Sequence, residues 1–139
     1  MKVLVTGASG YLGQHLLLAL PAAGHELHCA FGSFSAFADG LQIPMSLHPL
    51  DIASEEAVRL LLLETSPDIV VHCAAISSPA VCQRDAERAR AVNCPQGLVD
   101  ALPDNAGIIF LSTDQVTVIH RSLGMLRSEG IIHGSRIFF

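Results

Sequence analysis

The amino-terminal segment constrains the fold more than any other part of the chain. Lys2–Thr6 is a short run of apolar and β-branched residues, which is typical of a buried parallel strand. Gly7, Gly10 and Gly13 follow with the spacing G-x-x-G-x-x-G, and a run rich in leucine and alanine over residues 11–20 predicts a helix that Pro21 ends. A strand, a glycine turn and a helix in this order predict the start of a β-α-β unit.

The glycine turn also predicts a chemistry. The first glycine permits a tight turn, the second lets a pyrophosphate approach the backbone, and the third lets the helix pack closely on the sheet. The free N–H groups of the helix then face the phosphates. We therefore expect a dinucleotide site, with a glycine-rich turn that binds no ligand as the alternative. No Gly-Lys-Ser/Thr follows, which excludes a P-loop nucleotidase.

Strands and helices continue to alternate along the chain. Strands are predicted over Glu26–Phe31 and residues 43–50, 68–74 and 107–112, and helices over residues 55–65 and 85–102, with a break near Pro95 and Gly97. Such alternation gives a parallel sheet with right-handed crossovers and a site at the carboxyl ends of the strands. The predicted fold is α/β, a Rossmann-type doubly wound parallel sheet of about five strands that is incomplete at its C-terminal end.

Composition limits the class of partner. The chain has 139 residues, enough for one domain, and half of it is hydrophobic, so it can bury a core. The formal net charge of −5 argues against nucleic acid or an anionic membrane, because both reward a basic surface. The sequence shows neither an apolar run long enough for a membrane span nor a signal-peptide layout, so we expect a cytoplasmic protein.

Cysteines and histidines do not form a metal-binding pattern. None of the four cysteines belongs to a C-x-x-C pair. His25 and His28 are three residues apart in a segment predicted as a strand, and they do not form the motif H-E-x-x-H. We expect no metal site, and a reducing compartment without disulfides.

The nucleotide preference depends on the end of the second predicted strand. NAD-specific sites place an acidic residue there, against the ribose hydroxyls. This chain has Phe31-Gly32-Ser33 instead, with no acid and no arginine for a 2′-phosphate, and Ser33 is a candidate cofactor contact. The missing acid removes a repulsion, which favours NADP over NAD. Asp51 is a candidate contact for the adenine ring or, alternatively, a turn residue that leads into the Ser54 helix cap.

Five segments together resemble the extended short-chain dehydrogenase/reductase family. They are residues 6–13, 50–51, 68–75, 92–93 and 111–116, in unbroken order over residues 1–116. The last, Leu-Ser-Thr-Asp-Gln-Val, is most similar to the dTDP-4-dehydrorhamnose reductase branch, which also includes the regulatory β subunit of methionine adenosyltransferase. The resemblance implies an NAD(P)-binding Rossmann domain and, in complete members, reduction of a keto-sugar nucleotide.

The resemblance also implies roles for single residues. The positions that match cofactor-binding positions are the phosphate loop Gly7, Gly10 and Gly13, its neighbours Tyr11 and Leu12, the adenine contact Asp51, and the ribose-lining Ala74 and Ala75. The positions that match the catalytic site are the hydroxyl pair Ser112 and Thr113, one of which hydrogen-bonds the substrate carbonyl, and the supporting Asn93.

One part of the family's machinery has no counterpart. The family transfers its proton with a Tyr-x-x-x-Lys pair, C-terminal to the Ser/Thr strand, in which the lysine lowers the pKa of the tyrosine. The one tyrosine here, Tyr11, lies on the phosphate loop, and the one lysine, Lys2, begins the first strand. Ser112 and Thr113 therefore form at most a partial catalytic site.

Residues 117–139 differ in character from the rest. They hold Arg121, Arg127 and Arg136 against Glu129 alone, and they follow no period of a strand or a helix. We expect an NAD(P)-binding domain over residues 1–116, then a divergent tail without a substrate domain. Alternative splicing or a shifted reading frame is our hypothesis for the origin of this C-terminally truncated form.

These observations leave alternative functions open. The first is an NAD(P)-binding fragment of a keto-sugar nucleotide reductase, catalytically incompetent alone. The second is a regulatory subunit, similar to the methionine adenosyltransferase β subunit, that binds a protein partner or a second copy through sheet surface that lacks a covering helix. The third is a product that folds poorly.

Overall fold

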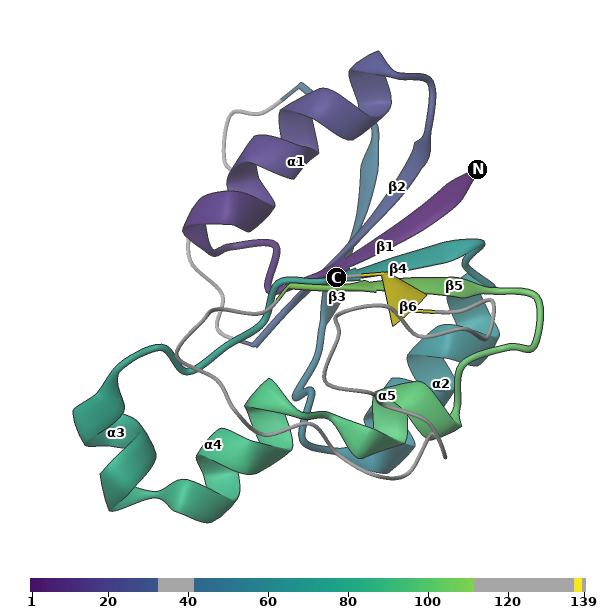
Figure 1. The fold of residues 1–139 in the computed structure, drawn as a ribbon. Helices are drawn as coiled ribbons and strands as arrows, with labels where there is room; N and C mark the ends of the chain where they lie inside the picture. Colours follow the sequence, from purple (N-terminus) through teal and green to yellow (C-terminus); the bar gives the residue numbers. More distant parts are fainter. Residues whose placement is uncertain (33–41, 112–136, 139) are drawn as a thin grey trace.

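A computed structural model describes residues 1–32, 42–111 and 137–138 of the chain (Figure 1). The strands are β1 (Lys2–Thr6), β2 (Glu26–Phe31), β3 (Met45–Pro49), β4 (Ile69–His72), β5 (Gly107–Phe110) and β6 (Ile137–Phe138). The helices are α1 (Tyr11–Ala22), α2 (Glu55–Thr65), α3 (Pro79–Arg84), α4 (Ala86–Asn93) and α5 (Gln96–Asp100).

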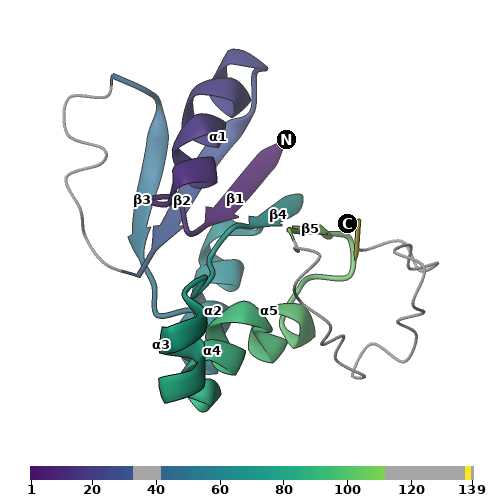
Figure 2. The same cartoon turned by 60° about the vertical axis from the view of Figure 1, so that its left-hand side comes forward.

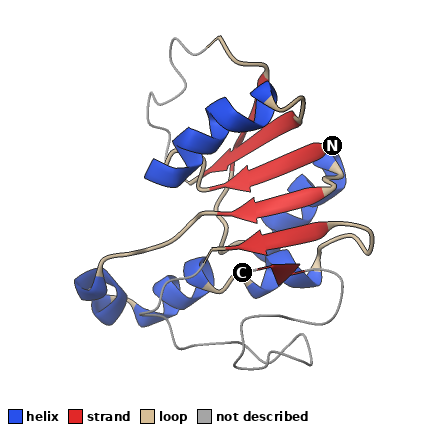
Figure 3. Cartoon of the chain, turned by 45° about the horizontal axis from the view of Figure 1, so that its top comes forward, coloured by secondary structure: helices blue, strands red, loops and turns tan. Residues whose placement is uncertain are grey.

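The strands form one parallel sheet in the order β3-β2-β1-β4-β5-β6 (Figure 3). The chain runs from β1 outward to β3, returns to β4 beside β1, and continues to the opposite edge. Strand order thus reverses between β1 and β4, which is where open α/β sheets bind ligands. The predicted α/β, Rossmann-type doubly wound sheet is confirmed, and β6 adds two residues beside β5.

Helices cover both faces of the sheet (Figure 2). On one face, Leu17 of α1 belongs to the same buried cluster as Val3 and Val5. On the other face, α2 and α5 pack in a second cluster that includes Leu4 and Val70. Successive residues of β1 therefore enter opposite clusters, as the two-residue period of a strand requires.

The helices differ from the sequence prediction in two places. Helix α1 continues through Pro21 and ends at Ala22, so Pro21 lies in its last turn. The predicted break near Pro95 is confirmed, since α4 ends at Asn93 and α5 begins at Gln96, but a further short helix, α3, precedes them and was not predicted. Pro79 occupies the first turn of α3, where a missing N–H is harmless. Asp85 then ends α3 and caps α4, because its side chain accepts a hydrogen bond from the Arg88 N–H at 3.0 Å.

Three predicted strands are shorter in the structure. β3 begins at Met45, directly after Pro44, which has no N–H to give to a sheet. β4 and β5 end at His72 and Phe110, before the segments that lead to the site. No helix in the described part of the chain is long and apolar enough to cross a membrane.

Candidate functional site

The turn between β1 and α1 depends on two glycines that no other residue can replace without movement of the backbone. Gly7 has a positive φ of 67°, and a Cβ atom on it would lie 2.5 Å from the Ala74 backbone nitrogen. A Cβ atom on Gly13 would lie 2.4 Å from the Gly7 carbonyl oxygen. Both distances are shorter than real Cβ contacts, so the turn lies directly against the end of β4 and against its own helix.

The N-terminus of α1, which follows the turn, has no side-chain cap. Gly10 is the N-cap residue, and the first turn of α1 contains no acidic residue. The first helical bond runs from the Gln14 N–H to the Gly10 carbonyl at 2.9 Å. The N–H groups of Tyr11, Leu12 and Gly13 precede it and have no carbonyl in the helix to bond. Together with the helix dipole, they make a site for an anion.

A pocket of about 450 Å³ lies at the carboxyl ends of the central strands. The glycine turn forms one wall, and the strand ends and α4 form the others. Five of the candidate residues line it, namely Gly7, Gly10, Asp51, Ala74 and Ala75. Tyr11 and Leu12 lie at the exposed start of α1, and Gly13 is buried behind the turn. Ser33, Ser112 and Thr113 lie outside the described residues.

Asp51 is held by two partners at the pocket. Its Oδ1 accepts hydrogen bonds from the Ala53 N–H at 3.0 Å and from Nη2 of Arg88 at 2.8 Å, and its Oδ2 accepts one from Nη1 of Arg88 at 3.1 Å. The Arg88 guanidinium is the larger cause that holds the pKa of Asp51 below its usual value, and the Ala53 N–H adds to it. Asp51 is therefore both a pocket residue and the turn residue that precedes the Ser54 cap.

An arginine lies at the pocket although none follows β2 in the sequence, because Arg88 comes from α4. The charged residues within 85–90 fit a solvated helix face, so the sequence does not mark Arg88 as a pocket residue. In the structure it lines the pocket, because the Asp85 cap places it in the first turn of α4, opposite Asp51. No local sequence signal marks this contact, since 37 residues separate the partners.

Asn93, at the end of α4, lies behind the pocket. Its Oδ1 accepts a hydrogen bond from the Ile76 N–H at 2.7 Å, and its Nδ2 donates to the Ile76 carbonyl at 3.0 Å. Ile76 itself lines the pocket. The side chain of Asn93 thus fixes the loop after β4 through both backbone groups of one residue.

A buried polar pair lies under the site. A hydrogen bond of 2.8 Å joins Thr6 Oγ1 to Nδ1 of His72, and both residues are almost completely buried. Nε2 of His72 has no hydrogen-bond partner among the described residues. Burial lowers the pKa of His72 to about 4, and the nearby Val92 backbone opposes this shift only in part. The ring stacks on Phe110 with a centroid distance of 4.8 Å.

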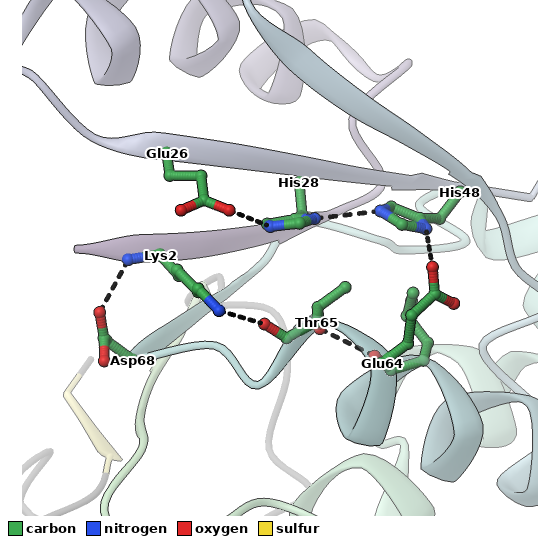
Figure 4. A network of polar contacts seen from close by, with 8 residues as sticks. Lys2, Glu26, His28, His48, Glu64, Thr65 and Asp68 are labelled. Carbon is green, nitrogen blue, oxygen red and sulfur yellow. Dashed lines mark hydrogen bonds and ion pairs between the residues drawn. The ribbon is translucent and has the colours of Figure 1, made fainter.

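A second polar network runs along the sheet and α2, outside the pocket (Figure 4). Nε2 of His28 donates to Glu26 at 3.1 Å, and Nδ1 of His28 lies 3.1 Å from Nε2 of His48. Nδ1 of His48 lies 4.0 Å from a carboxylate oxygen of Glu64. Among the described residues no three His, Cys, Asp or Glu side chains are grouped so that they could hold a metal ion.

The fold and the pocket together define a class of protein. A doubly wound parallel sheet with a glycine turn at the point of strand reversal is the Rossmann-type architecture of nucleotide-binding proteins. The family model "NAD dependent epimerase/dehydratase family" matches residues 3–118. The chain belongs to this family, which confirms the resemblance to extended short-chain dehydrogenases/reductases.

Relatives of similar sequence include two reductases and a subunit of methionine adenosyltransferase. "Probable low-salt glycan biosynthesis reductase Agl14" of Haloferax volcanii is 36% identical over 84% of this chain. A dTDP-4-dehydrorhamnose reductase of Mycolicibacterium smegmatis is 30% identical over 83% of the chain, and "Methionine adenosyltransferase 2 subunit beta" of Danio rerio is 30% identical over 83%. The chain spans 38%, 31% and 33% of the lengths of these relatives.

A solved structure supports the same relationship. The UDP-glucose-4-epimerase of Stenotrophomonas maltophila, solved with bound NAD and formylated UDP-arabinopyranose, superposes with a TM-score of 0.72. It is 25% identical to this chain, and the match covers 84% of this chain and 38% of the epimerase chain.

Proposed function

We propose that the chain binds a nicotinamide dinucleotide in the pocket at the carboxyl ends of β1, β2 and β4. The observation that carries the proposal is the N-terminus of α1, which has no side-chain cap. It follows a turn in which Gly7 and Gly13 stand at the two positions too close to the backbone for a side chain. A diphosphate fits this cradle, because Gly7 and Gly10 line the pocket without a side chain and the turn presents backbone N–H groups. The family of the chain and the NAD bound in the epimerase support the assignment.

Different residues of the site would contact different parts of the dinucleotide. Gly7 and Gly10, with the amides of Tyr11, Leu12 and Gly13, would hold the diphosphate. Asp51 would face the adenine, and Ala74 and Ala75 would line the ribose. Gly32 stands where NAD-specific sites carry an acid, and with Ser33 next in the sequence this favours NADP over NAD.

The chemistry of this chain is narrower than that of its reductase relatives. When bound, a reduced nicotinamide supplies a hydride. Ser112 and Thr113 would hydrogen-bond a substrate carbonyl, and Asn93 would hold the Ile76 loop in place. The 139 residues contain no Tyr-x-x-x-Lys pair, and the loss of a positioned proton donor typically costs about 10²–10⁴-fold in rate. We therefore propose a dinucleotide-binding domain over residues 1–116 and a divergent tail, which by themselves do not reduce a keto-sugar nucleotide. Four unpaired cysteines fit a reducing cytoplasm.

Thermal unfolding with and without ligand tests the binding. A ligand at ~100 times its Kd stabilises the folded chain by about 2.7 kcal/mol, so NADPH should raise the Tm by several degrees. NADH should need a higher concentration for the same shift. No shift with either dinucleotide would refute the proposal. Steady NADPH consumption with a 4-keto-sugar nucleotide, at the rate of an ordinary reductase, would refute the proposed incompetence.

The relative from Danio rerio favours a second candidate function, a regulatory subunit that binds a partner protein or a second copy. Exposed apolar side chains on α2, Leu60 and Leu63, give such an interface a place to form. Size-exclusion chromatography of the chain, alone and with the catalytic subunit of methionine adenosyltransferase, separates the two functions. Co-elution with the catalytic subunit supports a regulatory role. A chain that elutes as a monomer, alone and in the presence of the catalytic subunit, contradicts it.

A further inference from the structure

The inference concerns the ion pair between Arg88 and Asp51. Both residues line the pocket, and both side chains are about half exposed, at 46% and 52%. An exposed ion pair of this kind is weak, so a ligand can rearrange it at little cost. Of the described residues that line the pocket, these two are the charged ones.

The pair lies beside the end of β2. The Leu50 N–H donates to the Phe31 carbonyl at 2.9 Å, which places the residue before Asp51 against the residue before Gly32. A Cβ atom on Gly32 would lie 3.6 Å from the Leu50 carbonyl oxygen. Dinucleotide folds read the 2′-position of the adenosine ribose at the end of this strand. Gly32 has no side chain for that purpose, so the charged groups nearest in the pocket are those of Asp51 and Arg88.

The charge balance of the pair favours a phosphate over a hydroxyl. Asp51 alone would repel a 2′-phosphate, and the guanidinium of Arg88 cancels that charge. The two bonds to Asp51 use only part of the N–H donors of the guanidinium. Within the described part of the chain the guanidinium has no other hydrogen-bond partner, so its remaining donors can bind phosphate oxygens, for which a planar guanidinium is well suited.

We propose that Arg88 is the residue that selects NADP(H), by binding the 2′-phosphate from α4 instead of from the end of β2. The proposal rests on the dinucleotide function above. Asp51 has the opposite effect on the 2′-phosphate, and it holds Arg88 in place when no nucleotide is bound.

Calorimetric titration of Arg88→Met tests the role. Wild type should bind NADPH more tightly than NADH. In Arg88→Met the affinity for NADPH should fall about tenfold, as expected for the loss of a charged hydrogen bond, while that for NADH stays within about twofold. Adenosine 2′,5′-bisphosphate and 5′-AMP differ only in the 2′-phosphate, and their affinities should follow the same pattern. Asp51→Asn should raise the ratio of NADPH to NADH affinity.

Two further variants make the test specific. Arg84→Met removes an exposed arginine at the end of α3, outside the pocket, and should leave the ratio unchanged. Arg88→Lys should recover part of the preference and lose more of it as salt rises. An unchanged ratio in Arg88→Met, or a wild type that prefers NADH, overturns the role of Arg88 while the dinucleotide function stands. A wild type that binds neither dinucleotide overturns both.

Discussion

The amide side chain of Asn93 bonds both backbone polar groups of Ile76, with its oxygen 2.7 Å from the N–H and its nitrogen 3.0 Å from the carbonyl. Only a side chain with one donor and one acceptor can make both bonds. The contact ties the end of α4 to the loop that carries Ile76 along the pocket. A change at Asn93 should therefore affect folding and binding together.

Asn93→Asp should destabilise the fold by about 2 kcal/mol, because a carboxylate cannot donate to the Ile76 carbonyl and leaves it short of a partner. Urea unfolding measures the loss. Asn105→Asp, at an exposed turn, is the matched control and should change the free energy of unfolding by less than about 0.5 kcal/mol. Equal stability of the two variants would contradict the proposed clamp.

Gly7→Ala should be among the most damaging single changes in the chain. It forces a Cβ atom to within 2.5 Å of the Ala74 backbone and strains a positive φ, so we expect a loss of at least about 3 kcal/mol. In Gly107→Ala the new Cβ would meet Ile69 at an ordinary 3.7 Å, and the loss should stay near 1 kcal/mol or below. Urea unfolding of the two proteins gives the comparison, and similar midpoints would show that the turn has room for a side chain at Gly7.

The sequence was most informative where local signals act. β1, β2 and α2 have the predicted bounds, and for α2 the reason is visible at Ser54, whose side chain accepts the Ala57 N–H at 3.3 Å. The six residues of α3 are too few to show a helical period, and this helix was missed. The partnership of Asp51 with Arg88 was also missed, because it arises only when the fold brings α4 to the carboxyl ends of the strands.

Stability should depend on the protonation of His72. Its pKa is about 4 in the folded chain and 6.5 as the ordinary value, so the stability that the neutral ring contributes is complete above pH 6.5. As the pH falls from 6.5 to about 4, the unfolded chain takes up a proton that the folded chain refuses, and roughly 3 kcal/mol is lost. Urea unfolding across this range should show that loss in wild type and in the surface control His15→Gln. His72→Gln should lack it, and a slope unchanged by His72→Gln would disprove the assignment.

The two-histidine network gives a test by NMR titration. Burial is the main cause that lowers the pKa of His48, the charge of His28 lowers it further, and Glu64 opposes both. Glu64→Gln should therefore move the pKa of His48 further down, and His28→Gln should move it back up. Glu55→Gln, at the other end of α2, should leave it in place. A higher pKa of His48 in Glu64→Gln, or a lower one in His28→Gln, would contradict the geometry of Figure 4.

The most direct test of the dinucleotide site is calorimetric titration of NADPH into wild type and Gly10→Ala. Gly10 has a φ of −74°, which alanine adopts freely, and the added methyl would lie 3.1 Å from the Gly7 carbonyl oxygen, so the fold needs only a small adjustment. Gly10 lines the pocket, so a methyl group there should take room that the proposed diphosphate needs, and binding should weaken at least about tenfold, with Gly107→Ala as the unaffected control. Equal affinity of Gly10→Ala and wild type, or no binding by wild type, would contradict the account.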